Sequence, residues 1–574
     1  MTDVRPRLSF MAAALPGTLG ALVLEAVSAR NPWGPYRFTL FDDAMISMSY
    51  ARTLAVTGHL TWFDGAARVE GFTNPLWTLW MSVIHITGLH SSAAALAVSL
   101  SAIGCVFAAA VVAGCTVAAV GSRRAGHAAA FLVPLCFPTV YWSLRGMEVG
   151  LIALCMVVMF AVVVRSATTT PLLHGPELVS AAVVVGVWTR FDFVVVAGAT
   201  IASAWASGLL RFRTDVVRAI AASIFVSSLS VLTWQKAYYG NWLPNTYVLK
   251  MSGVSAVDRA VRGVAASGRS VIILAVLALV LARSFAQDRP NRRMILVGST
   301  AVVAAAGYSV YVGGDAWENV MLNRFMASCL PLVVMAVCIG ATERDRPARW
   351  DASVWLSGVV VVVGSVASLV MVNPFGFDTH RAAPQALVTV ALLLGGWVVQ
   401  RQRGRASTEW HEYMAGAMVV VVSAVPFFSQ IVHRDALLAR TNLYVTATVE
   451  TLSPALRDDA VVATVWAGVP AYYLGTPMID LLGKNDAHVA RTAPQASFFP
   501  GHNKWDYAYS VGLLRPDVVF QVFQRGDGPA VTDSFPGWGY ERRCMTSGVF
   551  PVRGVWVRKD STRVSHDLLV DCSS

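Results

Sequence analysis

The segment SFMAAALPGTLGALVLEAVSA, residues Ser9–Ala29, is predominantly apolar and follows two basic residues, Arg5 and Arg7. A helix of about 20 apolar residues crosses roughly 30 Å of hydrocarbon. A cleaved signal peptide has a shorter apolar core, and similar segments recur along the first 433 residues. The segment therefore predicts a retained membrane span whose N-terminus lies in the cytoplasm.

The composition of the whole chain agrees with this prediction. Of its 574 residues, 55% are hydrophobic and 14% are charged, and the mean hydropathy is +0.56. Soluble domains carry about 25% charged residues. These values exclude a disordered chain, a collagen-like chain and a small disulfide scaffold. They predict a polytopic α-helical membrane protein.

The net charge of +11 includes arginine clusters that lie between apolar runs. An excess of Arg and Lys in short loops marks the cytoplasmic side of a membrane protein. This distribution argues against nucleic-acid binding. The clusters are Arg211, Arg213 and Arg218; Arg283, Arg289, Arg292 and Arg293; Arg344, Arg346 and Arg349; and Arg401, Arg403 and Arg405.

In the second half of the chain, apolar spans alternate with loops of opposite character. Every arginine-rich loop then lies on the cytoplasmic side. The segments 239–267, 313–324 and 373–383 face outward, as does everything after about residue 433. The predicted spans are 217–238, 268–282, 294–312, 325–341, 353–372, 384–400 and 412–432.

In the first half, two ways of counting spans are open. One span for each apolar segment gives about 13 membrane helices in total, with the C-terminus outside, but it places Arg123 and Arg124 outside. Splitting 178–210 at Thr189-Arg190-Phe191-Asp192 and merging 75–120 also gives about 13 helices and obeys the charge rule. The apolar segments are 75–90, 92–120, 127–143, 148–166 and 178–210.

Two parts of the chain are not membrane spans. Residues 30–74 form a long outward loop within a transmembrane domain of residues 1–433. Residues 434–574 are predicted to form an extracytoplasmic mixed α/β domain, because β-like runs at 460–465 and 517–522 alternate with helical stretches.

The cysteines divide in the same way. Cys544 and Cys572 lie in the C-terminal domain, in a compartment that permits a disulfide between them. The others are expected to be buried as small hydrophobic side chains. They are residues 105, 115, 136, 155, 329 and 338, all in apolar segments.

The first outward loop carries two adjacent acids, Asp42 and Asp43, directly after Phe41. Adjacent carboxylates repel, so at least one should be held by donors or protonated. A carboxylate at the edge of a lipid-facing cavity can deprotonate an acceptor hydroxyl. The alternative is structural, because Asp before Ala-Met-Ile-Ser is a good helix N-cap.

The other outward segments interleave aromatic and polar residues. The segment 238–250 is either an interfacial aromatic belt or a site for a phosphate head group and a sugar. Arg324 either snorkels to the interface or neutralises a lipid phosphate. Mid-span acids and histidines, which an ion-coupled transporter usually carries, are scarce. No nucleotide-binding glycine loop or metal-ligand spacing is present. These features favour an enzyme that acts on the outer face.

At these residues the sequence resembles the polyprenyl-phosphate-dependent membrane glycosyltransferases of the GT-C fold. It is most similar to the actinobacterial arabinofuranosyltransferases that place terminal sugars on cell-wall arabinan. It departs from the family pattern at Met48-Ser49 and at Arg190-Phe191-Asp192-Phe193, which concerns the donor rather than the fold. The matching motifs cover most of the chain in order. They are 42–47, 70–77, 238–247, 313–315, 324–325, 467–468, 472–475, 479–486 and 500–507.

The resemblance implies inverting transfer of a sugar on the outer face of the plasma membrane. The expected donor is decaprenyl-phosphoryl-arabinofuranose, and the expected acceptor is the arabinan of arabinogalactan or lipoarabinomannan. Asp42 is expected to be the base that takes the proton of the acceptor hydroxyl, with Asp43 as its positioning partner; the reverse assignment is the alternative. No metal or other cofactor is expected at the catalytic centre.

The remaining candidate residues receive binding roles. Those for the lipid phosphate are Tyr239, Asn245, Tyr247, Lys250 and Arg324. Those for the sugar are Glu70, Asn74, Asp315 and Trp317. Those for the acceptor are His502, Trp505 and Asp506, with burial of Trp505 in the domain core as the alternative.

Three other functions are kept as alternatives. The first is transfer of mannose or another sugar by the same fold. The second is transport of a lipid-linked sugar without a new glycosidic bond. The third is a non-catalytic scaffold in which residues 434–574 bind a glycan.

Overall fold

The structure, a computed structural model, describes most of the chain except one long segment. The predicted spans 353–372, 384–400 and 412–432 lie outside the described residues, as do the outward segment 373–383 and several of the arginines. The count of 13 membrane helices therefore remains a prediction. The described residues are 5–168, 171–210, 214–267, 270–286, 291–317, 322–340, 437–526, 529–545 and 554–572.

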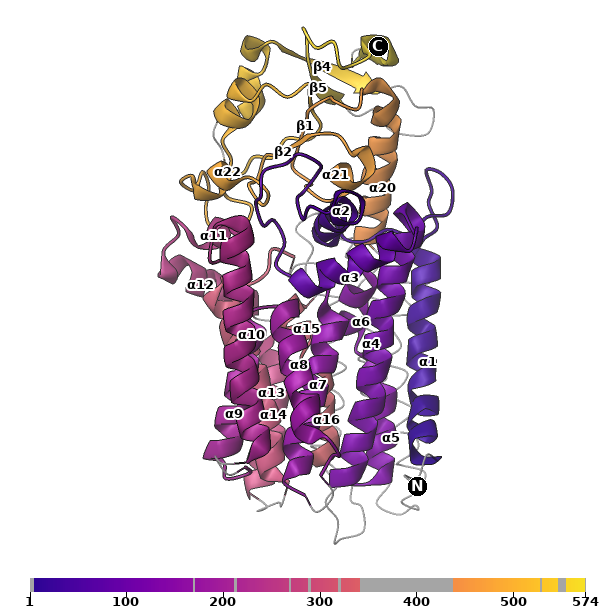
Figure 1. Cartoon of the computed structure of the whole chain (residues 1–574), viewed down its shortest axis with the longest axis vertical. Helices are drawn as coiled ribbons and strands as arrows, with labels where there is room; N and C mark the ends of the chain where they lie inside the picture. The colour runs from indigo at the N-terminus through magenta and orange to yellow at the C-terminus, as the bar shows by residue number, and fades with distance from the viewer. Residues whose placement is uncertain are drawn as a thin grey trace, which may run out of the picture.

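The N-terminal part forms a bundle of helices along the long axis of the molecule (Figure 1). Among the described residues, five helices are long and apolar enough to cross a membrane, and a pair bent by 45° would make a sixth. The five are α1 (Arg5–Ser28), α4 (Ser91–Val120), α7 (Val149–Ser166), α10 (Asp215–Tyr239) and α14 (Arg292–Tyr311). The bent pair is α5 (Arg123–Leu132) and α6 (Phe137–Leu144), linked by η1 (Val133–Leu135).

Shorter helices complete the bundle and its outer end. Those inside the bundle are α8 (Gly175–Thr189), α9 (Phe193–Ala206), α13 (Ser270–Ala286), α15 (Arg324–Ala327) and α16 (Leu330–Gly340). Those at the end that faces the C-terminal sheet are α2 (Asp42–Thr57), α3 (Pro75–Ile86), α11 (Asn245–Met251) and α12 (Ala256–Ala266) (Figure 1).

The turn between α4 and α5 lies at the same end of the bundle as the N-terminus. The ring of His127 packs on Phe10 at 4.7 Å, and its Nε2 lies 3.1 Å from Ser9 Oγ. Arg123 and Arg124 therefore share the N-terminal end, which corrects the count that assigns one span to each apolar segment.

The alternative count agrees with the described helices at both of the segments that it treats differently. The predicted split of 178–210 is confirmed, because α8 ends at Thr189 and α9 begins at Phe193. Counting 75–120 as one crossing also agrees with the structure, because α3 and α4 are separate helices but only α4 is long enough to cross. The 12 residues of α3 extend only about 18 Å, too short to cross the hydrocarbon.

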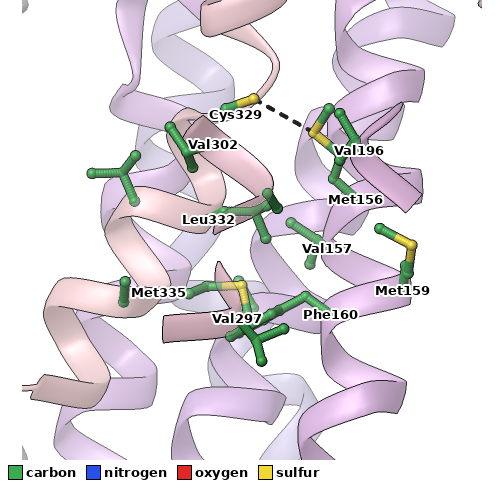
Figure 2. Packing of buried hydrophobic residues seen from close by; sticks show 14 of the residues in the cluster. Met156, Val157, Met159, Phe160, Val196, Val297, Val302, Cys329, Leu332 and Met335 are labelled. Atoms are coloured by element: carbon green, nitrogen blue, oxygen red, sulfur yellow. Dashed lines mark hydrogen bonds between the residues drawn. The ribbon is translucent and has the colours of Figure 1, made fainter. Parts of the chain in front are cut away.

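The core of the bundle is apolar and closely packed (Figure 2). Side chains of α7 such as Met156 and Phe160 meet Val297 of α14 and Leu332 of α16. The Sγ of Cys329 donates to the Sδ of Met156 at 3.8 Å. The six cysteines expected to be hydrophobic filling are free thiols and are buried or half-buried, as predicted.

The C-terminal part begins with α20 (Leu437–Leu452) and contains a six-stranded sheet in the order β2-β1-β3-β5-β4-β6. The predicted β-like runs contain β1 and β3. Cys544 and Cys572 form a disulfide. The parallel strands are β1 (Val462–Thr464), β2 (Met478–Asp480) and β3 (Val518–Val519). The antiparallel strands are β4 (Tyr540–Met545), β5 (Gly554–Arg558) and β6 (Leu569–Asp571). The helices α21 (Val469–Leu474) and α22 (Ala487–Arg491) follow β1 and β2.

The sheet lies at the end of the bundle opposite the N-terminus, with α2 between the two (Figure 1). Buried hydrogen bonds join these parts. Asn442 Nδ2 donates to the carbonyl of Leu40 at 2.7 Å, and Trp62 Nε1 donates to the carbonyl of Ala467 at 2.9 Å. The first outward loop is therefore held between the bundle and the sheet.

A buried ion pair joins α1 to the end of α6 and generates a stability prediction. Arg145 Nη2 lies 2.7 Å from Glu25 Oε2, and both side chains are 3% exposed. Because Arg145→Met leaves a buried carboxylate unpaired, it should lower the free energy of unfolding by about 3–5 kcal/mol. Adding Glu25→Gln should recover much of this loss. Thermal unfolding of the detergent-solubilised protein measures both.

The control is Arg218→Met. Arg218 pairs with Asp215 at the surface, where the two side chains are 66% and 81% exposed. Its loss should cost less than about 1 kcal/mol. Equal destabilisation by the buried and the exposed substitution would contradict the structural role of the Glu25–Arg145 pair.

Candidate functional site

The two adjacent acids lie in the first turn of α2. The preceding residue, Phe41, is extended and fully buried, and its ring packs edge-on against Trp317 at 5.0 Å. This packing fixes the start of the helix. Asp42 does not cap its own helix, because the N-cap residue is Phe41. The alternative that Asp42 serves only as the N-cap of its own helix is therefore wrong.

Asp42 instead caps a helix of the C-terminal part. Its Oδ1 accepts the backbone N–H groups of Gly468 at 3.1 Å and Val469 at 2.8 Å, at the start of α21. Burial raises the pKa of Asp42 to about 7, although Lys484 and these N–H groups oppose the rise. The acid can therefore take up or release a proton near neutral pH.

Asp43 lies between two cations. Its Oδ1 accepts from Lys484 Nζ at 2.6 Å, and its Oδ2 lies 3.2 Å from Arg324 Nη1. Burial alone would raise its pKa, but Lys484 and Arg324 outweigh burial and hold the pKa well below its usual range. The two acids therefore differ: Asp43 stays ionised, whereas Asp42 titrates near pH 7.

Arg324 is held in place by a second carboxylate. Its Nε and Nη2 donate to Asp315 at 2.6 and 3.0 Å, and its guanidinium lies over the ring of Trp142. Gly313 and Gly314 both have positive φ, which gives the sharp turn that presents Asp315. The Arg324 side chain is 11% exposed and paired with acids, so it does not snorkel to the interface.

Lys250 of α11 faces the same group of charges. Burial and, after it, the charge of Arg324 lower the pKa of Lys250 to about 8, although Asp315 and Asp43 oppose the shift. No described residue accepts a hydrogen bond from its ammonium. The described site thus contains an ammonium that an incoming anion can bind without displacing an existing partner.

Three other residues predicted to bind the lipid phosphate have different contacts. Asn245 Nδ2 donates to the carbonyls of Gly483, Lys484 and Asp486 at 2.9–3.2 Å, so it holds the loop that carries Lys484. Tyr239 donates to the carbonyl of Leu60. Tyr247 forms a hydrogen bond with Tyr311. Among the five predicted residues, the structure brings only Lys250 and Arg324 to the acids.

Two predicted sugar-binding residues belong to the supporting structure. Asn74 accepts from Ser47 at 2.8 Å and donates to Glu148 at 2.9 Å. Glu70 is buried, accepts from Gln235 at 3.3 Å, and has its pKa raised by burial to about 8. Both side chains are buried, Asn74 uses both the oxygen and the nitrogen of its amide in these contacts, and Glu70 Oε2 has no hydrogen-bond partner among the described residues.

The other predicted sugar-binding and acceptor residues divide between the site and the core. Asp315 binds Arg324, as described above, and Trp317 contacts His502 edge-on at 6.0 Å. Trp505 is 7% exposed within the C-terminal core, which confirms the alternative for this residue. Asp506 pairs with His488 at 3.0 Å. Only His502 of the three predicted acceptor residues is placed among the charges of the site.

A cavity opens from this cluster into the bundle, between α7, α9, α14 and α15. Arg190 and Arg324 line it together with Tyr308, and Ile152 and Met156 form part of its apolar wall. Arg190 is fixed by Glu148 at 2.7 Å and by Asp192 at 3.0 Å. The lining thus combines two acid-paired arginines with apolar side chains.

Sequence reasoning missed three residues of this site. Lys484 was marked only by its place in the matching motif 479–486, and Glu148 is the first residue of the apolar segment 148–166, with no other signal. Arg190 had a clearer signal, because it interrupts an apolar segment, where ionisable residues are costly.

Solved structures of ArnT from Cupriavidus metallidurans share this architecture. The apo structure superposes with a TM-score of 0.55 at 14% sequence identity and covers 96% of this chain and 98% of ArnT. The structure bound to undecaprenyl phosphate gives a TM-score of 0.56 at 12% identity, with the same coverage. The chain has the GT-C fold. The GT-C fold predicted from the sequence is thereby confirmed, whereas the count of 13 membrane helices and the extracytoplasmic position of the C-terminal part stay predictions.

The C-terminal part of this GT-C chain also matches a sequence family. That family is described as a domain of unknown function, DUF8728, and it matches residues 434–561. No curated protein matches the sequence at a significant level.

The contact between Asp42 and the C-terminal part depends on a glycine. A Cβ at Gly468 would clash with the backbone carbonyl of Asp42 and with Met45. We expect Gly468→Ala to separate α21 from α2 and to lower the free energy of unfolding by about 1–3 kcal/mol, as overpacking does. Gly537→Ala is the matched control, because a Cβ at Gly537 meets nothing within 4 Å. Equal thermal unfolding of the two variants would refute this contact.

Proposed function

We propose that this protein is an inverting glycosyltransferase that moves arabinofuranose from a decaprenyl-phosphate donor to a cell-wall arabinan. The observation that carries the proposal is the acid pair Asp42–Asp43 beside the cations Arg324, Lys484 and Lys250. Transfer to a hydroxyl requires a base for the acceptor and positive charge for the phosphate leaving group. The site supplies both within one cluster.

Two features support a polyprenyl-phosphate donor. The Lys250 ammonium has no hydrogen-bond acceptor among the described residues, so a phosphate oxygen can bind it directly. The cavity beside Arg324 continues past Arg190 to the apolar side chains of Ile152 and Met156. The same fold in ArnT has been solved with undecaprenyl phosphate bound. The proposal places the phosphate at the cations and the isoprenoid chain along the apolar side chains beside Arg324, which must move apart to admit it.

In the proposed reaction the acceptor oxygen attacks the anomeric carbon from the face opposite the phosphate. The new C–O bond forms as the bond to the phosphate oxygen breaks, and the bonding electrons leave with polyprenyl phosphate. Asp42 takes the proton of the acceptor hydroxyl. Lys250 and Arg324 offset the charge of the leaving group, so the proposal assigns no role to a metal. A single displacement inverts the anomeric configuration.

The proposed orientation follows from the charge rule. Arg123 and Arg124 lie at the N-terminal end of the bundle, so that end is assigned to the cytoplasm. The acids and the C-terminal sheet then lie outside the plasma membrane, where cell-wall arabinan is available as acceptor.

The raised pKa of Asp42 is the reason for assigning it as the base, because a base works best when its pKa is near the working pH. A base must be deprotonated, and the pKa of Asp42 is about 7. We therefore expect kcat/KM to rise with pH up to about 7. It should fall again above about pH 8, where Lys250 loses the proton that gives it the charge to stabilise the leaving group. If Asp43 is the base, the acid limb lies below about pH 4, because its pKa is depressed.

The test is transfer from decaprenyl-phosphoryl-arabinofuranose to a short arabinan in membranes, across pH 5–9. Asp42→Asn should lower kcat about 10²–10⁴-fold, the usual contribution of a general base. Transfer from a mannosyl lipid alone would agree with the proposed mechanism but would show that the assignment of arabinofuranose is wrong. A wild-type protein that moves the lipid but forms no glycosidic bond would overturn the enzyme assignment in favour of a transporter.

A further inference from the structure

The parallel half of the C-terminal sheet points the carboxyl ends of its strands at the acid pair. The loop after β1 leads to Gly468, which donates to Asp42, and the loop after β2 carries Lys484, which donates to Asp43. In open α/β sheets, ligands bind in the crevice at the carboxyl ends of the parallel strands. Here that edge lies against the membrane part of the site, so each acid has a partner from a different loop of the sheet.

The loop that carries Lys484 is built to hold one conformation. The carboxylate of Asp480 accepts the backbone N–H groups of Leu482, Gly483 and Asn485 at 2.7–3.1 Å. Gly483 has a φ of 78°, and a Cβ there would lie 2.8 Å from the backbone nitrogen of Ala490. The turn therefore requires glycine at this position and closes around a buried carboxylate.

A helix of the N-terminal part holds the outer side of the same loop. Asn245 of α11 donates from one amide nitrogen toward three of the loop carbonyls. The loop is thus fixed from the inside by Asp480 and from the outside by Asn245. Such double support is expected where a side chain must be placed accurately, and the side chain that this loop presents to the bundle is Lys484.

The charge environment shows what Lys484 contributes. The groups that act on the acid pair are Arg324 of α15, Lys250 of α11, Asp315 of the preceding turn, His502 and Lys484 of the C-terminal part, and each acid on the other. Arg324 is shared with Asp315. The Lys484 ammonium bonds only to Asp43 among the described residues, and its side chain is 14% exposed.

We propose that Lys484 is a positioning residue of the transfer reaction, which fixes the Asp43 carboxylate between two cations and makes the C-terminal sheet an integral part of the catalytic centre. This inference rests on the proposed glycosyltransferase function. It assigns to the sheet a role in the chemistry, in addition to the predicted role in holding the acceptor glycan. The supply of the second cation from a distant part of the chain also makes activity depend on docking of the sheet.

The electrostatic consequence gives a readout that a purely structural lysine would not share. Lys484 lowers the pKa values of both Asp42 and Asp43. Its removal raises both pKa values, so a smaller fraction of either acid is deprotonated at a given pH on the acid limb. The acid limb of kcat/KM therefore moves to higher pH whichever acid is the base.

The experiment compares the full-length wild type with Lys484→Met and Lys484→Arg in the arabinan transfer assay. Lys484→Met should lower kcat/KM at pH 7 at least about tenfold and move the acid limb upward by about 1–3 pH units, the usual effect of losing an adjacent opposite charge. Lys484→Arg should return the acid limb of kcat/KM to its wild-type pH, because Arg keeps the positive charge. Lys559→Met is the matched control, because Lys559 is an exposed lysine of the same sheet region and should leave activity unchanged.

Each outcome decides the inference. An unmoved acid limb in a folded Lys484→Met protein overturns it, even if kcat falls. If Lys484→Met does not fold, as judged by thermal unfolding, Lys484→Gln replaces it, since Gln keeps a donor and removes the charge. Absence of transfer by the wild type, with arabinosyl and mannosyl donors alike, instead overturns the proposed function and this inference with it.

Discussion

Two adjacent carboxylates at the start of one buried helix impose the constraint on which the rest of this site depends. A buried charge is costly unless it is paired and hydrogen-bonded. Asp42 and Asp43 therefore require partners, and α2 cannot supply them. The partners come from the loop after β1 and the loop after β2 in the C-terminal sheet, and from Arg324 at the start of α15. The electrostatic requirement of two residues thus joins three distant parts of the chain, and it explains why the sheet docks on the outer end of the bundle.

The same requirement separates the two acids chemically. Cations hold Asp43 ionised, whereas burial leaves Asp42 with a pKa near 7. Pairs of titratable groups whose surroundings push their pKa values apart are typical of acid–base sites. Lys250 adds a further positive charge to the site, and Arg324 also lines a cavity that has apolar side chains in its wall. The site therefore combines a base, positive charge and a partly apolar cavity beside Arg324, which are the features that the proposed lipid-phosphate donor needs.

Much of this arrangement could be predicted from the sequence, because it depends on residues that are close together in the chain. The length of the apolar segments predicted membrane spans, and the polar residues near Arg190 predicted a break between two helices. The adjacent acids in an outward loop predicted the candidate base. What could not be predicted depends on pairing across more than 150 residues. Asn245 was expected to bind phosphate but holds the loop around Lys484, and Glu70 was expected to bind sugar but is buried against α10. A polar side chain in a motif has the same appearance whether it binds a ligand or a distant backbone carbonyl.

The most direct test of the account is the anomeric configuration of the product. A donor of defined configuration, decaprenyl-phosphoryl-arabinofuranose with a ¹³C label at the anomeric carbon, is incubated with the purified protein and an arabinan acceptor. NMR of the new glycosidic bond then reports the stereochemistry. One displacement by an acceptor hydroxyl, with Asp42 as base, predicts complete inversion. Retention would require a covalent intermediate or a second displacement, for which the account has no nucleophile, and would contradict it.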